Sequence, residues 1–160
     1  KVETSAYVPA CIDHVVGRDR ILVAWAYRKE PQTGIFEDVI RLQPLETDGT
    51  YEGDEIELDG PRLVKYPGRH HRSFDGMSLG DRRICIAWLH RENGGETSLR
   101  VGLFDGQGKP LGSDLEIPAQ ADPTDPHVLP TGQPGGILLV WLDRPVGAEN
   151  RRVYVASLSH

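Results

Sequence analysis

Three arginines occupy the same place in three similar segments of the chain. Each segment is an apolar octet that ends in Trp-x-x-Arg, and the octets are ILVAWAYR (21–28), ICIAWLHR (84–91) and ILLVWLDR (137–144). A guanidinium group presents its donors in a fixed plane, which suits bidentate recognition of carboxylate, sulfate or phosphate. We therefore take the final arginines as candidate residues for binding an anion: Arg28, Arg91 and Arg144. Alternatively, each one pairs with an acid in the adjoining turn, namely Glu30, Glu92 and Glu149.

A basic segment, residues 61–72, is a second candidate for ligand binding. Its sequence, PRLVKYPGRHHR, stands out in a chain whose net charge is −6. It could bind an anionic sugar, a phosphate or an acidic protein surface, and the alternative is a solvated loop that pairs with the acidic residues 52–59. The candidate contacts in it are Tyr66, Arg69, His70, His71 and Arg72.

Several classes of function are disfavoured. GxSxG, Walker, GxGxxG and HExxH motifs are absent, and the Asp-rich turns lack the ligand spacing of an EF-hand. The adjacent histidines of the basic segment point to opposite faces of an extended strand, which disfavours a shared metal ion. The acidic net charge disfavours nucleic acid, and no apolar run approaches the roughly 20 residues of a membrane helix. We predict no metal, no cofactor, no nucleic-acid partner and no membrane span.

Short strands must position the candidate residues. A short segment and a turn precede each octet, and an alternating strand follows it: EDVIRLQPL, SLRVGLF or RRVYVASL. After the first two, Asp48-Gly49 and Asp105-Gly106 predict tight turns into the acidic strands DEIELDG and SDLEIPA. Because the octets are apolar at consecutive positions, both of their faces should be covered. Each unit therefore predicts four antiparallel strands, and no helix is expected.

Aromatic residues and cysteines in these strands are expected to serve packing. We predict that Trp25, Trp88 and Trp141 are buried between sheets rather than offered as sugar platforms. Two residues after each tryptophan the residue type varies, which leaves a grafted site or an unconstrained position open: Tyr27, His90 and Asp143. Cys11 and Cys85 are predicted to be buried thiols, and a disulfide between them would require neighbouring strands.

The domain organisation follows from these repeats. We predict a single domain, residues 1–160, with repeats at 9–59, 73–117 and 125–160 and the basic segment as an insertion. The third repeat lacks a fourth strand, and residues 1–8 read as a spare strand that would complete it. Four-stranded units with a covered second strand fit the blades of a β-propeller, permuted here by one strand. A β-sandwich is the alternative fold.

Two stretches resemble a known type of repeat. ILLVWLDR and LRVGLFDGQGKPLGSDLEI (99–117) resemble the blade repeats of bacterial extracellular β-propellers of the sialidase-like and lectin-like kind. The resemblance implies a propeller-type fold and an extracellular or periplasmic location. It assigns no catalytic residue, because Arg-Ile-Pro is absent and SFDGMSL only distorts an Asp box.

The sequence favours a binding module over an enzyme. Propeller rings have about 4–8 blades, so three blades make half of a six-bladed ring. We predict a non-enzymatic binding or assembly module whose blades are completed by another copy, as a homo-oligomer, or by a second protein chain. Two alternatives stay open: a lectin for acidic glycans, and part of a sialidase-like glycoside hydrolase.

Overall fold

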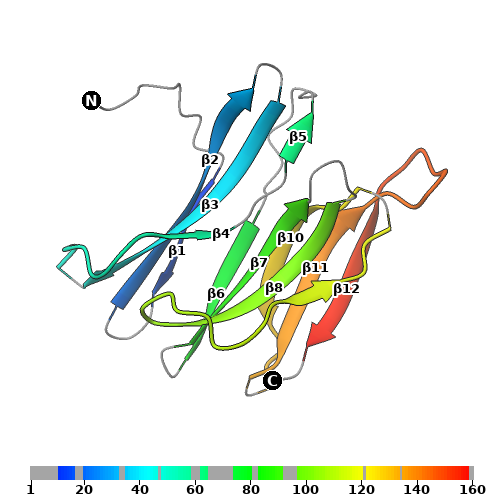
Figure 1. The fold of residues 1–160 in the computed structure, drawn as a ribbon. Helices are drawn as coiled ribbons and strands as arrows, with labels where there is room; N and C mark the ends of the chain where they lie inside the picture. Colours follow the sequence, from blue (N-terminus) through cyan, green and yellow to red (C-terminus); the bar gives the residue numbers. More distant parts are fainter. Residues whose placement is uncertain are drawn as a thin grey trace.

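The chain folds into three antiparallel β-sheets (Figure 1). The computed structural model describes residues 11–16, 20–32, 35–46, 48–58, 62–64, 74–80, 83–91, 97–120, 122–133 and 135–158. The all-β class predicted from the sequence is confirmed, and every regular element in these ranges is a strand. No helix of the described residues is long and apolar enough to cross a membrane. The predicted strand at residues 1–8 lies outside the described ranges.

Each sheet is formed by strands that follow one another along the chain. The first sheet has the order β1-β2-β3-β4, and β5 also pairs with β3. Its strands are β1 (Cys11–Val16), β2 (Arg20–Gln32), β3 (Ile35–Glu46), β4 (Ile56–Leu58) and β5 (Arg62–Val64). The second sheet is formed by β6 (Phe74–Gly80), β7 (Arg83–Arg91), β8 (Thr97–Asp105) and β9 (Leu115–Ile117). The third sheet is formed by β10 (Thr124–Pro130), β11 (Ile137–Asp143) and β12 (Arg152–Leu158).

The strand pairing aligns the three sheets residue by residue. The tryptophan of the second strand lies opposite Arg41 in the first sheet, Arg100 in the second and Tyr154 in the third. Residues counted from these pairs occupy equivalent positions on the pleated surface. These equivalences allow a residue in one sheet to be compared with its counterparts in the other two.

The turns between the third and fourth strands are also equivalent, with a shift from the predicted register. Glu46 and Thr50 bracket the first turn, and Asp105 and Lys109 bracket the second with the same backbone hydrogen bonds. The positive φ of the second turn falls on Gly108 (76°), the counterpart of Gly49 (86°). The prediction of a tight turn on Asp105-Gly106 is therefore wrong by two residues. Instead, the Asp105 carboxylate accepts hydrogen bonds from the backbone N–H groups of Gln107 and Lys109, which fixes a turn over residues 105–109 of the same kind as the turn over residues 46–50.

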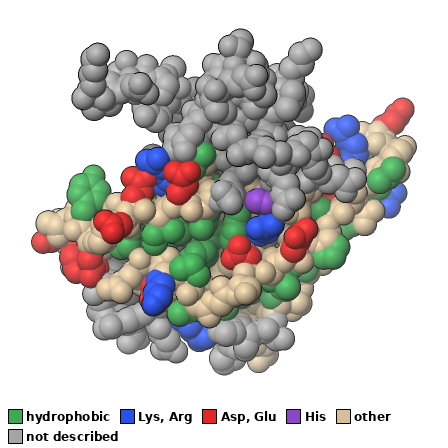
Figure 2. Space-filling model, in the orientation of Figure 1, with side chains coloured by type: hydrophobic (Ala, Val, Ile, Leu, Met, Phe, Trp, Pro, Cys, Tyr) green, Lys and Arg blue, Asp and Glu red, His purple; other side chains and the backbone are tan. Residues whose placement is uncertain are grey.

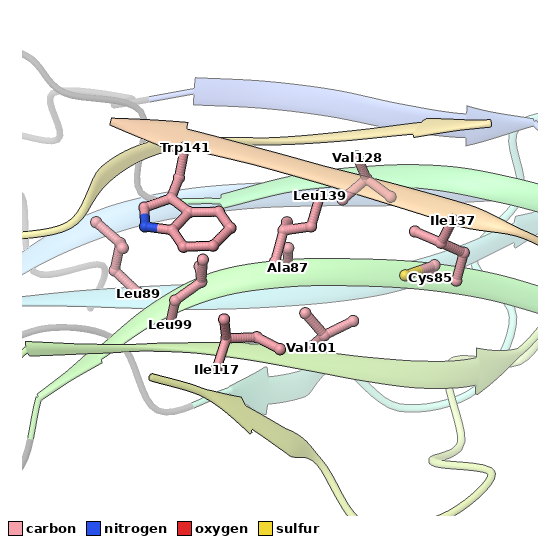
Figure 3. Close-up of a cluster of buried hydrophobic side chains, with 10 residues drawn as sticks. All are labelled: Cys85, Ala87, Leu89, Leu99, Val101, Ile117, Val128, Ile137, Leu139 and Trp141. Carbon is pink, nitrogen blue, oxygen red and sulfur yellow. The ribbon is translucent and has the colours of Figure 1, made fainter. Parts of the chain in front are cut away.

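The hydrophobic core consists of two layers, one on each side of the second sheet. On one face of β7, side chains pack against the first sheet in a cluster that includes Ile86, Trp88, Leu22 and Leu42. On the other face, Cys85, Ala87 and Leu89 pack against the third sheet. Figure 3 shows this second cluster filling the space between β11 and the strands β7 and β8. The prediction that a second strand is covered on both faces is confirmed for β7, whose residues 84–90 are all buried.

Candidate functional site

The three candidate arginines do not occupy one kind of position. Arg144 directly follows β11 and Arg91 is the last residue of β7, as expected for residues at the end of a strand. Arg28 differs, because β2 continues to Gln32 and places Arg28 inside the strand, opposite Asp38. Only the side chain of Arg144 lies within the described part of the chain. The described side chains therefore include no ring of arginines.

Most of the basic segment also lies outside the described residues. Its first part forms β5, which pairs with the start of β3 and continues the line of β4 along that strand. The segment therefore begins as part of the first sheet rather than as a free loop. Its candidate contacts fall outside the described ranges: Tyr66, Arg69, His70, His71 and Arg72.

Arg144 lies in a small charged cluster where the β9–β10 connection meets the β11–β12 turn. Its Nη2 is 3.8 Å from Asp122 Oδ2, and about half of each side chain is exposed. The same carboxylate oxygen is 2.7 Å from Arg151 Nη2, and Arg151 Nη1 donates to Thr124 Oγ1 at 2.9 Å. The acid beside Arg144 is thus Asp122, whereas the sequence had suggested Glu149. Nothing in the sequence spacing pointed to Asp122, because it comes from the preceding connection.

The buried side chain of Asp143 holds the backbone beneath this charged cluster in place. Its side chain is fully buried, and its two oxygens accept hydrogen bonds from the backbone N–H groups of Gln120 (2.6 Å), Asp122 (2.9 Å) and Arg144 (2.8 Å). A buried carboxylate is tolerated when it is hydrogen-bonded in this way. Asp143 therefore fixes the β9–β10 connection onto β11. This structural role is neither the grafted site nor the unconstrained position that the sequence left open.

Asp75 makes a second polar contact, between the second and third sheets. Its Oδ2 accepts a hydrogen bond from Val128 N at 2.9 Å and lies 3.5 Å from His127 Nδ1. Asp75 is on β6 and Val128 is on β10, so the contact holds the first strands of two sheets side by side. This is again a positioning contact. In the part of the chain that the structure describes, no group of three or more His, Cys, Asp or Glu side chains could hold a metal ion.

Among the described side chains, an arginine repeats on the third strand of the first two sheets. Arg41 forms ion pairs with Glu55 and with Glu57, the latter at 3.3 Å. Its counterpart Arg100 lies 4.0 Å from Glu116. Sequence reasoning missed this repeat, although the triplets IRL in EDVIRLQPL and LRV in SLRVGLF carry its signal. In the third sheet Tyr154 takes this position and stacks on Trp141, with ring centroids 5.7 Å apart.

The third sheet exposes apolar side chains that its counterparts bury. Val153 and Val155 are 65% and 58% exposed, whereas the equivalent Leu99 and Val101 of the second sheet are 0% and 6% exposed. In the first sheet the counterparts, Ile40 and Leu42, are completely buried. Figure 2 shows hydrophobic side chains at the surface over the second and third sheets, among charged ones. We call the following set the outer face of the third sheet: Leu129, Leu138, Val140, Leu142, Val153 and Val155.

A pocket of about 150 Å³ opens between the second and third sheets, at the end opposite Arg144. Leu158 lines it and is the counterpart of Phe104, which is 1% exposed. Phe104 lies in the equivalent contact, between the first and second sheets, and that contact is tightly packed. For example, a Cβ on Gly108, in the turn that follows Phe104, would lie 2.5 Å from Ile56 Cδ1 of the first sheet. The pocket thus marks the place where the third sheet has a smaller side chain than the second. Its lining residues are Val101, Leu103, Leu111, Gly112, Ser113, Leu115, Ile137 and Leu158.

No model of a known protein family matches this chain, and no curated protein matches it. Among the described residues, the strongest candidate is the outer face of the third sheet, because its side chains are exposed at positions that the rest of the chain buries.

The thiol of Cys85 is an internal probe of this packing. Cys85 is free and fully buried, and burial, with the nearby Asp75 charge as a second cause, raises the pKa of its thiol to about 12. A raised thiol pKa leaves stability unchanged below about pH 9 and lowers it as pH rises from 9 towards 12, because the unfolded chain ionises first.

We expect Cys85 to resist labelling in the folded protein. At pH 8 its thiolate fraction is roughly 1,000-fold below that of an unfolded cysteine, since three pKa units separate the two states. A Cys11→Ser variant, which leaves Cys85 as its one thiol, should react with a thiol reagent in urea but not in buffer. Rapid labelling in buffer at pH 8 would contradict the packing of β7 against the third sheet.

Proposed function

We propose that the chain is an assembly module of the β-propeller type, and that the outer face of the third sheet binds a further β-sheet from another copy or another chain. The observation that carries this proposal is the exposure of Val153 and Val155 at positions that are buried in both other sheets. Fully burying a valine-sized side chain contributes about 1.5–3 kcal/mol, so two such residues on one face favour association.

The arrangement of the sheets supports blades rather than a two-sheet sandwich. Three sheets stack in the order of the chain, with the second between the other two. Their first strands lie side by side, since β6 is close to both β1 and β10. In a propeller, blades pack face to face around an axis in this way. The three sheets would be successive blades, and residues 1–8 would add the fourth strand beside β12 in the permuted arrangement.

The same proposal gives the edge strand of the third sheet, β12, a role as the place where a fourth strand is added. In the first two sheets the third strand pairs with a fourth, as β8 does with β9. Within the described residues β12 pairs with β11 alone. An added strand would remove an open edge, which sheet proteins usually cover. An extracellular or periplasmic location is part of the proposal, and it is supported only by the resemblance of the repeats to those of bacterial extracellular β-propellers.

A pair of exposed valines tests the proposal. Val155→Asp should convert an assembly measured by sedimentation into the 17.7 kDa chain. In dilute solution, where the wild type is also a monomer, the thermal unfolding of the two chains should be the same. Val146→Asp is the matched control, because Val146 is 82% exposed in the β11–β12 turn and lies off the sheet face. A wild-type chain that stays monomeric at every concentration, or an assembly that survives Val155→Asp, would contradict the proposal.

Binding of an acidic glycan is a second candidate. The half-exposed guanidinium of Arg144 lies beside the same carboxylate as Arg151, so two cations converge at one end of the third sheet. Asp122 neutralises part of that charge, which makes this candidate weaker. An array of acidic glycans would test it, and binding that is lost in Arg144→Ala would support it. Binding that Arg144→Ala leaves unchanged, or no binding to any acidic glycan, would contradict it.

A further inference from the structure

Resting on the proposed function, we infer that the partner is a second copy of this chain, and that the outer face of the third sheet docks onto the tryptophan-bearing face of the first sheet. We call the latter the Trp25 face. It is the side of β2 and β3 that points away from the second sheet, and its described residues are Val23, Trp25, Val39, Arg41, Gln43 and Leu45. Val39 and Gln43 are already buried within the chain, and the other four are partly buried.

The chain already contains this type of contact twice. In each case the tryptophan-bearing face of one sheet packs on the preceding sheet, on the face that carries no tryptophan. Trp88 of the second sheet joins the cluster formed with Leu22 and Leu42 of the first. Trp141 of the third sheet joins the cluster formed with Ala87 and Val101 of the second. The sheets are therefore related head to tail, and each contact uses two different faces.

A head-to-tail series of three sheets ends with one face of each kind on which no further sheet of the described residues packs. The outer face of the third sheet is equivalent to the faces that receive a tryptophan, because Val140 and Val155 correspond to Ala87 and Val101. At the other end, Trp25 is only half-buried, whereas its counterparts Trp88 and Trp141 are 2% and 5% exposed. One chain thus carries both halves of the contact.

Charge does not oppose this docking. The equivalent contact between the first and second sheets has Arg100 at its rim, where its side chain is a quarter exposed and close to Glu116. Arg41 on the Trp25 face is likewise held by Glu55 and Glu57 and is about a third exposed. The apolar residues around Trp25 can therefore be covered while this ion pair stays at the edge.

Closure fixes the number of copies. A contact between two different faces either closes into a ring or extends into a filament. Propeller rings have about 4–8 blades, so two copies with three sheets each fall within that range and three copies exceed it. The expected particle is a two-fold ring of six sheets, in which the third sheet of each copy meets the first sheet of the other.

A mixing experiment tests this arrangement. Val155→Asp damages one half of the contact and Trp25→Asp damages the other, so each variant alone should sediment at 17.7 kDa. An equal mixture retains one undamaged contact, between the third sheet of the Trp25 variant and the first sheet of the Val155 variant. The mixture should therefore contain a species of twice the single-chain mass. Val23→Asp serves as the second first-sheet variant if circular dichroism shows that Trp25→Asp does not fold.

The outcomes separate this inference from the proposed function. If Trp25→Asp and Val23→Asp still assemble while Val155→Asp does not, the third sheet binds another third sheet and the inference is wrong. If the wild type assembles but the mixture stays monomeric, or if the mass grows without limit as filaments, the two-copy ring is also wrong. A monomeric wild type would instead contradict the proposed function itself.

Discussion

Asp143→Asn is expected to lower the free energy of unfolding by about 2–4 kcal/mol, a large effect for the exchange of one oxygen for an NH₂ group. The Asp143 carboxylate is fully buried, and both of its oxygens accept hydrogen bonds from backbone N–H groups. An amide offers only one acceptor oxygen. Its NH₂ group would face a backbone N–H, either that of Gln120 or those of Asp122 and Arg144, and a part-buried donor would lose its partner. Urea denaturation measures the loss.

Asp122→Asn is the control for that exchange. Asp122 is also a carboxylate in this cluster, but about half of its side chain is exposed and its partners are the side chains of Arg151 and Arg144. Exposed ion pairs contribute about 0–1 kcal/mol, so the control should lose little stability. Amide exchange at Gln120 should accelerate in Asp143→Asn and not in Asp122→Asn. Equal losses in the two variants would show that the buried carboxylate does not anchor the β9–β10 connection.

Local sequence patterns predicted the strands well because each strand's signal is contained in its own residues. The apolar octets became β2, β7 and β11, and the alternating segments that follow them became β3, β8 and β12. The prediction that tryptophan serves packing is confirmed at Trp88 and Trp141, which are both buried. Consecutive apolar residues demand cover on two faces, and the stack of sheets provides it for β7.

Pairing between distant segments was not predictable in the same way. The partner of Arg144 is Asp122, which the chain brings near through a separate connection, so spacing within one repeat carries no information about it. The short strand β5 contains only three residues and depends on the free edge of β3 beyond β4. The shifted turn at Asp105 followed the hydrogen-bonding capacity of its carboxylate rather than the dipeptide Asp-Gly. Arg28 lies inside β2 because that strand runs on to Gln32.

The three tryptophans should differ in their contribution to stability according to what covers them. Trp88→Ala is expected to cost about 3–5 kcal/mol, because it removes a fully buried indole between two sheets. Trp88 also contacts Phe104, with ring centroids 6.4 Å apart, so the loss extends to a second aromatic residue. The stability loss in Trp141→Ala should fall in the same range, because this change removes the ring that stacks on Tyr154. Tyr51→Ala is the control, because Tyr51 is 82% exposed and should change stability by at most about 0.5 kcal/mol.

Trp25 is the informative member of this series, because the third sheet of a second copy would cover it in the assembly. In dilute solution, where the chain is a monomer, Trp25→Ala removes a half-buried indole and should cost clearly less than Trp88→Ala. At concentrations where the wild type assembles, the difference between wild type and Trp25→Ala should grow, because stability gained from association depends on protein concentration. Urea denaturation at a low and a high protein concentration measures both the loss in the monomer and the additional loss in the assembly. A loss that equals that of Trp88→Ala and does not depend on concentration would mean that the Trp25 face is already closed within one chain.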